Sequence, residues 1–377
     1  MKKHILFVSR AIPKHQTGGM EIAAWDLAKE FVKLGCRVSF ITTSIPNAPE
    51  RIHLDGIDVT AIANTKSGTY SKNWWRESKK YFDNEYAYRV DGIFSVSAGA
   101  YGIVSSKKLP KNLPIIFQAH GTSLREFKSK LTSFNIKNLI SSLKNIYGLL
   151  VDFKYYKKFS KIVAVGKGVF DDLQAYPFAY LNNKVLLIYN GIDTNLFSVA
   201  KNLSVYDELN ISPVSKLILT VSRLHPQKGV HVALNAFAKY LHESPNTHYV
   251  IVGDGKARTD LMRQAQQLNI DKNVHFIGHV NRENLQKYYS AANVFLFTTL
   301  HQEGLPLNVL EALASGLPVV LSKHVAGSLP FSKNIFAVDE GNIVSELEKA
   351  LAVDGKVCYL PEEFTLEYSA KKYLELF

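Results

Sequence analysis

Two glutamates on either side of a predicted helix start have the clearest chemical potential in this sequence. Glu303 precedes Gly304 in a loop, and Glu311 follows eight residues later, inside the expected helix. Pro306 suits the first helical position and Gly316 the position just past the helix end, because helix termini favour these residue types. Carboxylates at such places can accept hydrogen bonds from the hydroxyl groups of a ligand.

The start of this helix is expected to offer free backbone N–H groups. Leu305, the expected N-cap, has no side-chain oxygen, so the N–H groups of Leu307, Asn308 and Val309 are predicted to lack a capping partner. A helix N-terminus of this kind is a site for phosphate. Phosphate at the helix start, with hydroxyls on the two carboxylates, suits a sugar nucleotide.

Two cations lie five residues apart in a loop between a predicted strand and a predicted helix. Arg223 and Lys228 can converge there on one diphosphate. In that position they would offset the charge that develops on a departing nucleoside diphosphate. An ordinary solvated basic loop is the alternative.

Glycine turns follow two other predicted strands. Gly18 and Gly19 open the first helix, where glycine permits close approach to a ligand and exposes N–H groups. Gly253 lies in a second strand-end turn, but Arg258 breaks the dinucleotide pattern G-x-G-x-x-G. A plain turn is the alternative at both places.

His120 and Asn190 each follow a predicted strand directly. His120 precedes a glycine at the strand edge where ligands bind, which favours a functional reading over a purely structural histidine. Asn190 begins an Asn-Gly turn, and its alternative role is to let the chain leave the first domain.

The sequence pattern points to neither a metal nor a cofactor. No Asp-x-Asp pair follows a strand, and no group of His and Cys has metal-site spacing. The expected chemistry needs no metal, and a nucleotide sugar would be a substrate rather than a cofactor.

The chain is long enough for two domains, and its charge is uneven. Its 377 residues suggest two domains of about 150–200 residues. The formal net charge is +12: residues 1–200 hold 28 Lys and Arg against 15 Asp and Glu, whereas residues 201–377 hold 17 against 18. The basic first half is compatible with an anionic membrane, an anionic acceptor or nucleic acid.

Cysteine usage and hydropathy favour the cytoplasm. Cys36 and Cys358 are far apart and read as reduced thiols. The basic start of the chain precedes an apolar run of four residues, too short for a signal peptide, and no run approaches the roughly 18 residues that span a bilayer. We expect a cytoplasmic protein, and peripheral contact with the inner face of the cytoplasmic membrane stays open.

Short apolar segments rich in β-branched residues alternate with helical patterns along the chain. The strand candidates are 4–8, 38–42, 57–62, 92–97, 115–119, 162–165, 185–188, 216–222, 248–252, 274–277, 294–297 and 318–321. Such strands between amphipathic helices predict parallel sheets covered on both faces. The pattern occurs twice around a polar link at 198–215, so we expect an α/β chain of two doubly wound domains with ligands at the strand carboxyl ends.

Residues 123–161 form a basic segment with apolar residues at helical spacing. It holds nine basic residues against two acidic ones. Its helical part, 134–161, could lie on an anionic membrane, or its apolar face could simply pack on the sheet.

Taken in order, these segments resemble the retaining glycosyltransferases of family 4, which have two Rossmann-like domains around a central cleft in the B-type architecture. The resembling segments are Gly18–Glu21, His120-Gly121, Asn190–Asp193, Arg223–Gly229, Gly253–Gly255, Phe276–Val280 and Glu303–Glu311. The resemblance implies an acceptor-side domain over 1–198 and a nucleotide-sugar domain over 199–360. It also implies a C-terminal helix over 361–377 that crosses back to the first domain.

The resemblance implies roles for most of these residues. The donor-binding residues would be Gly18, Gly19, Asn190, Arg223, Lys228, Gly253, Gly278, His279, Val280, Glu303, Gly304, Leu307, Asn308 and Glu311. The catalytic residues would be His120, near the transferred sugar, with Arg223, Lys228 and Glu303. Among the donor-binding residues, Glu303 would hold the sugar hydroxyls and Glu311 the ribose hydroxyls, with Gly278–Val280 at the nucleobase.

The family is thought to react on one face of the sugar, so Glu303 is not assigned as a covalent nucleophile, unlike the paired carboxylates of hydrolases. The sequence departs from the family after Val320, where neither a Gly-Gly-x-Pro-Glu segment nor a later Asp-Gly-x-x-Gly turn is clear.

We therefore predict a metal-independent, hexosyltransferase-type retaining enzyme. It would move a sugar from a nucleoside-diphosphate sugar to a glycan or lipid-linked acceptor in bacterial surface polysaccharide synthesis, such as lipopolysaccharide or capsule. The enzymatic alternative is a sugar-nucleotide epimerase of the same architecture. A protein that binds nucleic acid through its basic half is the non-enzymatic alternative, which leaves Glu303 and Glu311 unexplained.

Overall fold

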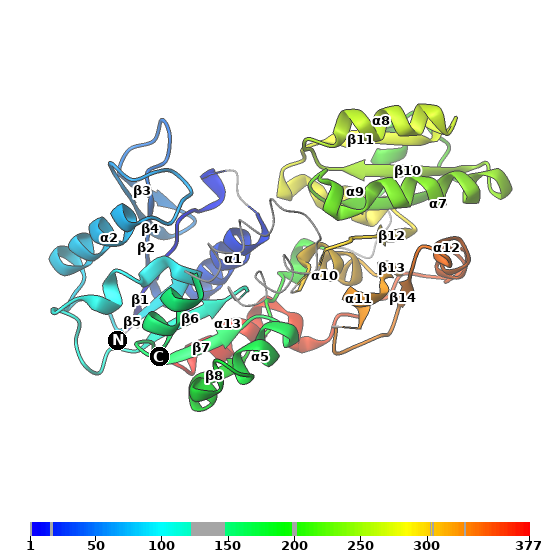
Figure 1. The fold of residues 1–377 in the computed structure, drawn as a ribbon. Helices are drawn as coiled ribbons and strands as arrows, with labels where there is room; N and C mark the ends of the chain where they lie inside the picture. Colours follow the sequence, from blue (N-terminus) through cyan, green and yellow to red (C-terminus); the bar gives the residue numbers. More distant parts are fainter. Residues whose placement is uncertain are drawn as a thin grey trace. The chain divides into compact units, whose positions relative to one another are not determined.

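The chain folds into two α/β units, each built on its own sheet. The computed structural model describes residues 2–15, 18–121, 148–197, 202–301, 303, 305–327 and 329–377. The first unit comprises Met1–Ile192 and Glu362–Phe377, and the second comprises Asp193–Pro361 (Figure 1). Two Rossmann-like units with largely parallel sheets confirm the predicted fold class.

The first unit holds an eight-stranded sheet in the order β3-β4-β2-β1-β5-β6-β7-β8. Its strands are β1 (His4–Val8), β2 (Arg37–Thr43), β3 (Arg51–Leu54), β4 (Ile57–Ile62), β5 (Gly92–Val96), β6 (Ile115–Ala119), β7 (Lys161–Ala164) and β8 (Val185–Leu187). Neighbouring strands are parallel except for the β3–β4 hairpin. Its turn residues Asp55 and Gly56 have φ of 54° and 78°, as an Asp-Gly hairpin turn requires.

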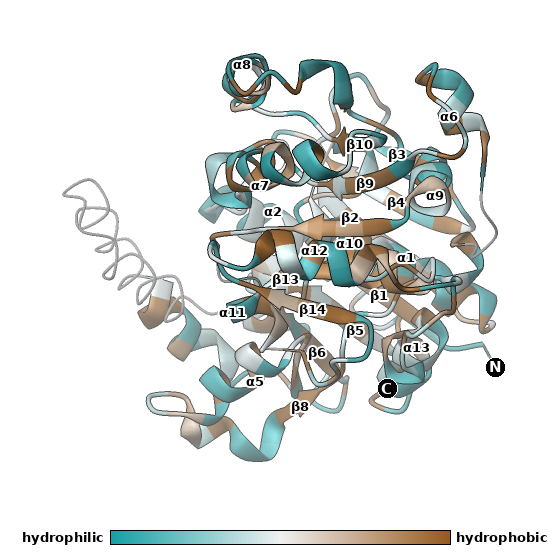
Figure 2. Cartoon of the chain, turned by 90° about the vertical axis from the view of Figure 1, so that its right-hand side faces the viewer, coloured by the Kyte–Doolittle hydropathy of each residue, from teal (hydrophilic) through white to brown (hydrophobic). Residues whose placement is uncertain are grey.

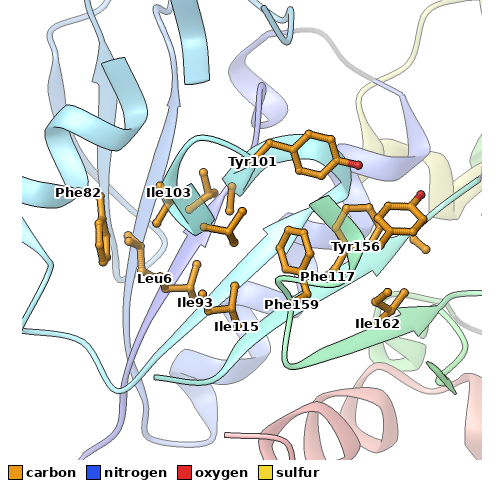
Figure 3. Close-up of a cluster of buried hydrophobic side chains, with 14 of the residues drawn as sticks. Leu6, Phe82, Ile93, Tyr101, Ile103, Ile115, Phe117, Tyr156, Phe159 and Ile162 are labelled. Atoms are coloured by element: carbon orange, nitrogen blue, oxygen red, sulfur yellow. The ribbon is translucent and has the colours of Figure 1, made fainter. Parts of the chain in front are cut away.

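Helices cover both faces of this sheet. They are α1 (Gly19–Lys33), α2 (Lys72–Glu85), residues 148–156, α5 (Lys167–Gln174) and α13 (Leu366–Leu374). Alternate residues of β1 point to opposite faces. Phe7 belongs to the core beneath α1 and α13, and Leu6 to the core beneath α2 and residues 148–156 (Figure 3).

The C-terminal tail belongs to the first unit. Leu366, Ala370 and Tyr373 of α13 lie in the same core as Phe7, and the Tyr373 ring centre lies 5.1 Å from that of Phe94. The turn at Gly191 fixes this return, because a Cβ there would lie 2.2 Å from the carbonyl oxygen of Thr365.

The second unit holds a six-stranded parallel sheet in the order β11-β10-β9-β12-β13-β14. Its strands are β9 (Lys216–Val221), β10 (Thr247–Val252), β11 (Val274–Gly278), β12 (Val294–Phe297), β13 (Val319–Ser322) and β14 (Ile335–Val338). Its helices are α6 (Ser204–Glu208), α7 (Val230–Glu243), α8 (Arg258–Gln267), α9 (Arg282–Ala291), α10 (Leu307–Ala314), α11 (Lys323–Ala326) and α12 (Ile343–Leu351). Figure 2 shows hydrophobic strands such as β14, whereas α8 is largely hydrophilic.

Short 3₁₀ helices complete the description. They are η1 (Pro13–His15), η2 (Ser97–Ala100), η3 (Ile103–Ser105), η4 (Ala179–Lys184), η5 (Thr194–Leu196), η6 (Pro226–Lys228), η7 (Asp271–Asn273) and η8 (Glu362–Phe364). Both cysteines are free, with Cys36 half-buried and Cys358 exposed. Among the described residues, no helix has the length and apolar character needed to cross a bilayer.

All twelve predicted strands form, within one residue at most of their ends, and two edge strands were missed. β3 alternates exposed and half-buried residues, so it lacks the continuous apolar run of a buried parallel strand. β14 has four residues, of which one is buried, two are half-buried and one is exposed, and it lies at an edge of the second sheet.

Candidate nucleotide-sugar site

The predicted cations and the predicted loop glutamate meet at one point of the second sheet. The strand order reverses beside β9, which lies between β10 and β12. Ile218 of β9 pairs with Val294 of β12, so the loops that leave these strands are neighbours. Ligands of open parallel sheets bind outside such a reversal, at the carboxyl ends of the strands. The loop after β9 carries Arg223 and Lys228, and the loop after β12 carries Glu303.

Lys228 and Glu303 form a short ion pair. Lys228 Nζ lies 2.6 Å from Glu303 Oε1, and Thr299 Oγ1 donates to the same oxygen at 3.2 Å. The side chains are only 19% and 16% exposed. The ammonium also lies 5.6 Å from the centre of the Phe297 ring. Because both charges are largely shielded from water, each depends on a partner of opposite charge.

Gly229 holds the lysine loop against the neighbouring loop. Its φ is +67°, and a Cβ there would lie 1.9 Å from the carbonyl oxygen of Thr298. Thr298 Oγ1 donates to the Gly229 carbonyl at 2.8 Å, and the Leu300 N–H donates to the Gln227 carbonyl at 2.8 Å. Lys228 is therefore positioned by backbone packing that only glycine permits.

Arg223 lies exposed on the same loop and has no ion-pair partner among the residues that the structure describes. Burial lowers the pKa of His225, and the charges of Lys256, Arg223 and Lys228 lower it further. The loop thus carries a positive field in which an anion would be favoured.

The start of α10 differs from the prediction by one residue. Pro306 is the N-cap rather than the first helical residue, and no side chain caps the helix. The Val309 N–H is not free, since it donates to the Pro306 carbonyl at 3.1 Å and to Asn308 Oδ1 at 3.0 Å. The prediction of three free N–H groups was wrong at Val309, because the extended Pro306 carbonyl and the Asn308 side chain satisfy it.

Asn308 also ties the helix to the sheet. Its Nδ2 donates to the carbonyl of Val221 at 2.8 Å, at the end of β9. Leu307 and Asn308 are half-buried at the first turn of α10. The helix start is therefore fixed beside the strand that leads to Arg223 and Lys228.

Glu311 is 6% exposed and held within the second unit. Tyr289 donates its hydroxyl to Oε2 at 2.8 Å, and an Arg282 nitrogen lies 3.6 Å from Oε1. Burial and the Glu311 charge raise the pKa of Tyr289. Both oxygens of Glu311 therefore have a polar neighbour within the second unit.

The loops after β10 and β11 are joined through glycines. The Gly253 N–H donates to the Gly278 carbonyl at 2.8 Å. Gly253 has φ of +132°, and a Cβ there would lie 1.9 Å from the Ser222 carbonyl, next to Arg223. Beyond Gly278, His279 is exposed and Val280 is half-buried.

The remaining predicted residues lie in the first unit. Gly18 is the N-cap of α1 and Gly19 its first residue, and both are exposed. Burial, with a smaller contribution from the Arg10 charge, lowers the pKa of His120 to about 3. His120 is therefore neutral at physiological pH.

His120 and Asn190 belong to one polar network through Gln118. His120 Nε2 lies 2.9 Å from Gln118 Oε1, and Gln118 Nε2 donates to Asn190 Oδ1 at 3.4 Å and to the Tyr373 hydroxyl at 3.3 Å. Gln118 and Asn190 are buried. The network links His120 to the returning helix α13, so Asn190 has a structural role here. Its contact with the donor stays a prediction.

Several residues of these sites were missed from the sequence. Arg10 donates to the buried Glu21 at 2.9 Å and lies 5.5 Å above the Tyr70 ring. Gln118 is a polar residue inside an apolar strand, which is a recognisable signal. Tyr289 carried no signal, because nothing in the sequence pairs it with Glu311.

Some predictions fall outside the described residues. Gly304 is one of them, and so are residues 122–147, most of the basic segment. In the described part of the chain, no three His, Cys, Asp or Glu side chains are grouped as metal ligands would be. Of the predicted residues that are described, Gly18, Gly19, His120 and Asn190 lie in the first unit and the others in the second.

Two protein families match this chain in succession. The family described as Glycosyltransferase Family 4 matches residues 17–196. The family described as Glycosyl transferases group 1 matches residues 207–341. Together the two matches reach into both units.

Individual relatives agree with these matches. An uncharacterised glycosyltransferase of Methanocaldococcus jannaschii is 26% identical over 343 residues, 88% of this chain and 83% of the relative. The UDP-Gal:alpha-D-GlcNAc-diphosphoundecaprenol alpha-1,3-galactosyltransferase of Escherichia coli is 35% identical over 159 residues, 41% of this chain and 40% of the relative. The solved structure of Anabaena HepE in complex with UDP-glucose has a TM-score of 0.70 at 17% identity, covering 99% of this chain and 98% of HepE.

Proposed function

The chain belongs to family 4 of the glycosyltransferases, and from this premise we propose that it transfers a sugar from a nucleoside-diphosphate sugar with retention of anomeric configuration. The proposed acceptor is a glycan or a lipid-linked glycan. The observation that carries the proposal is the Lys228–Glu303 ion pair at the strand reversal of the second sheet.

This ion pair can exchange partners when a donor binds. Lys228 would turn from Glu303 to the donor diphosphate, and Glu303 would accept hydrogen bonds from the donor sugar hydroxyls. Both charged groups are largely shielded from water, so each needs a new partner when the ion pair opens. The diphosphate would supply that partner for Lys228, and the sugar hydroxyls would supply it for Glu303. Arg223 would add a second cation to the diphosphate.

The reaction needs charge stabilisation on the leaving group. The bond between the anomeric carbon and the diphosphate oxygen breaks, and the acceptor oxygen bonds to that carbon on the same face. The acceptor proton passes to the departing diphosphate. Arg223, Lys228 and the start of α10 would stabilise the developing negative charge, which is typically a large contribution to catalysis. In this proposal no metal is required for that step.

His120 would lie beside the transferred sugar. Its lowered pKa keeps the imidazole neutral, so it adds no positive charge near an anomeric carbon that is itself becoming positive. With Nε2 directed to Gln118, Nδ1 is the nitrogen left to face a ligand.

Relatives and charge support the acceptor class. The Escherichia coli relative is named for an acceptor carried on diphosphoundecaprenol. The first half of this chain carries 28 Lys and Arg against 15 Asp and Glu, which suits a phosphorylated acceptor or an anionic membrane. We therefore propose a role in surface polysaccharide synthesis at the cytoplasmic face of a membrane.

A product assay tests the proposed function. The full chain is incubated with UDP-sugars and a lipid-diphosphate acceptor, and the linkage of the product is read by NMR. We expect an acceptor-linked product with the anomeric configuration of the donor. An inverted product would contradict retention, and an isomerised donor without acceptor product would support the epimerase.

Paired variants connect that activity to the site. Lys228→Ala should reduce transfer about 100- to 1000-fold, as for other groups that stabilise developing charge. Glu303→Ala should also reduce transfer strongly, because it removes the acceptor of the donor sugar hydroxyls and leaves Lys228 without its partner. The control is a similar pair on α12, where Lys349 Nζ lies 2.7 Å from Glu346 Oε1. Lys349→Ala and Glu346→Ala should leave transfer unchanged. Full activity of both site variants would refute the assignment.

A further inference from the structure

A pocket in the first unit is lined by none of the residues assigned above. It has a volume of about 520 Å³ and lies between α2, the loop after β5 and residues 148–156. The side chains that give it its character are Lys72, Trp75, Arg76, Lys79, Lys154 and Tyr155. Four are cations and two are aromatic, and the described residues that line it include no carboxylate.

The cations of α2 lie near its N-terminus, where the helix dipole disfavours positive charge. Lys72 is the first residue of the helix and Arg76 follows one turn later, and no acidic residue lies in the first turn. A helix N-terminus already carries partial positive charge, so cations there are unfavourable unless an anion is near. Arg76 donates to Glu77 at 2.9 Å, whereas Lys72 and Lys79 have no ion pair within the described residues.

The opposite wall adds a second group of crowded cations. Lys154 Nζ and Lys158 Nζ lie 5.6 Å and 5.5 Å from the centre of the Tyr155 ring. Lys158 Nζ donates to Ser105 Oγ at 2.9 Å. Burial lowers the pKa of Lys158, and the charges of Lys154 and Lys157 lower it further. The carboxylate described on this helix, Asp152, is buried and does not line the pocket.

The floor of the pocket is aromatic and firmly held. The Tyr101 and Tyr155 rings stack with centres 4.5 Å apart and planes at 7°, and the Trp75 ring centre lies 6.4 Å from that of Tyr155. Trp75 Nε1 donates to the Ala98 carbonyl at 2.9 Å. Tyr101 lies at one margin of the buried cluster drawn in Figure 3, and its hydroxyl donates to the buried Asp152 at 2.9 Å.

The rim of the pocket is apolar at one place. Leu150 is 63% exposed, and it lies one helical turn before Lys154. An exposed leucine beside aromatic rings and lysines suits a ligand with both an anionic and an apolar part. A free anion would contact the lysines but leave the leucine in water.

We propose that this pocket binds the phosphate group of a lipid, with the lysines on the phosphate and Leu150 on the adjoining apolar chain. Lysines near an anionic lipid surface and aromatic rings at its interface are the groups that such a ligand recognises. The ligand is either a bulk anionic phospholipid or the lipid diphosphate of an acceptor, and the latter source rests on the proposed function.

Vesicle co-sedimentation of the full chain tests the pocket. The probes are phosphatidylcholine vesicles, the same vesicles with phosphatidylglycerol, and the same vesicles with a polyprenyl diphosphate. The test variant is Lys72→Gln/Lys79→Gln/Lys154→Gln. The control is Lys66→Gln/Lys107→Gln/Lys111→Gln, which removes the same charge from three exposed lysines of the first unit that lie outside the pocket.

We expect the test variant to bind anionic vesicles more weakly by about fivefold for each lysine removed, because one lysine near such a surface contributes about a factor of five. The control should change binding much less. Leu150→Gln should weaken vesicle binding about tenfold, as expected for lost burial of an apolar side chain. Loss with phosphatidylglycerol identifies bulk lipid as the ligand, and loss with the diphosphate lipid alone identifies the acceptor.

Three results would overturn the proposal. The first is an equal loss of vesicle binding in the test and control variants. The second is that the parent chain binds neither kind of anionic vesicle. The third, from a parallel assay with an oligonucleotide, is that the test variant loses oligonucleotide binding but keeps vesicle binding. Stabilisation by UDP-sugars is measured in the same variants and should not change. A failure of that stabilisation would count against the proposed function and leave the pocket test standing.

Discussion

The two units differ in how positive charge is balanced at their predicted ligand sites. In the second unit, Lys228 Nζ lies 2.6 Å from Glu303 Oε1. The loop of Lys228 is held by Gly229, where a Cβ would clash with the Thr298 carbonyl. In the first unit, Lys72, Lys79 and Lys154 line a pocket that has no carboxylate among its described lining residues. The difference suggests that the second unit is prepared for a ligand with both phosphate and hydroxyls. The first unit offers positive charge to a ligand that brings the negative charge itself.

The backbone lock of the second unit should show the largest effect. Gly229→Ala places a Cβ 1.9 Å from the Thr298 carbonyl at a φ of +67°. We expect it to lower the free energy of unfolding by about 3 kcal/mol and to abolish transfer, because the Lys228 loop must move. Urea denaturation measures the first effect.

Gly355→Ala is the matched control for that variant. Gly355 has a similar φ of +76°, but no atom lies within 4 Å of the added Cβ. It should cost only about 1 kcal/mol. Equal losses in the two variants would show that strain at positive φ, rather than contact between the two loops, fixes the site.

Arg223 should affect donor affinity without affecting the fold. Arg223→Ala is expected to raise the KM for the donor about tenfold, since a charge-assisted hydrogen bond contributes about 1.5–3 kcal/mol. Its thermal stability should match that of the parent. Arg263→Ala removes an exposed arginine of α8 as a control. An unchanged KM in Arg223→Ala would remove this residue from the donor site.

Tyr289 should have a smaller effect through Glu311. Tyr289→Phe removes the hydroxyl that donates to Glu311 Oε2 at 2.8 Å, and it leaves the ring in place. We expect a loss of about 1 kcal/mol in stability and a several-fold rise in the dissociation constant for nucleoside diphosphate. Calorimetric titration measures the second quantity. Unchanged affinity would indicate that Glu311 does not reach the ribose.

His120 should contribute a modest pH dependence from the first unit. Its pKa is lowered from 6.5 to about 3, so the unfolded chain binds more protons between these values and stability falls as the pH drops below 6.5. The contribution is at most about 1.4 kcal/mol for each pH unit. His120→Gln should therefore lose less stability than the parent between pH 6.5 and about pH 5. Identical pH profiles would show that His120 is not held in the neutral form.

The contrast between the units also shows how far the sequence could be read. Buried strands such as β1 and β9 were predicted because they are continuous apolar runs, whereas β3 at a sheet edge was missed despite its Asp-Gly turn. Arg223 and Glu303 were recognised from local motifs. The ion pair between Lys228 and Glu303 joins residues 75 positions apart, and it follows only from the pairing of β9 with β12.

The pocket of the first unit could not have been predicted in the same way. Its cations come from two separate helices. Residues 148–156 belong to the basic segment that the sequence marked as a possible membrane helix, whereas nothing in the sequence singled out α2 or paired it with that segment. Their convergence depends on Gly102, where a Cβ would lie 1.9 Å from the Trp75 carbonyl, so the loop after β5 can pack closely on α2. Such contacts depend on tertiary packing and carry no periodic signal.

The central claim is that Lys228 leaves Glu303 to bind the donor diphosphate. Thermal unfolding of the parent, Lys228→Ala and Lys349→Ala, each with and without UDP, tests it most directly. At a ligand concentration of 100 times Kd, binding stabilises the native state by about 2.7 kcal/mol. We predict a clear rise in Tm for the parent and for Lys349→Ala, and little or none for Lys228→Ala. An equal rise in all three proteins would contradict the claim.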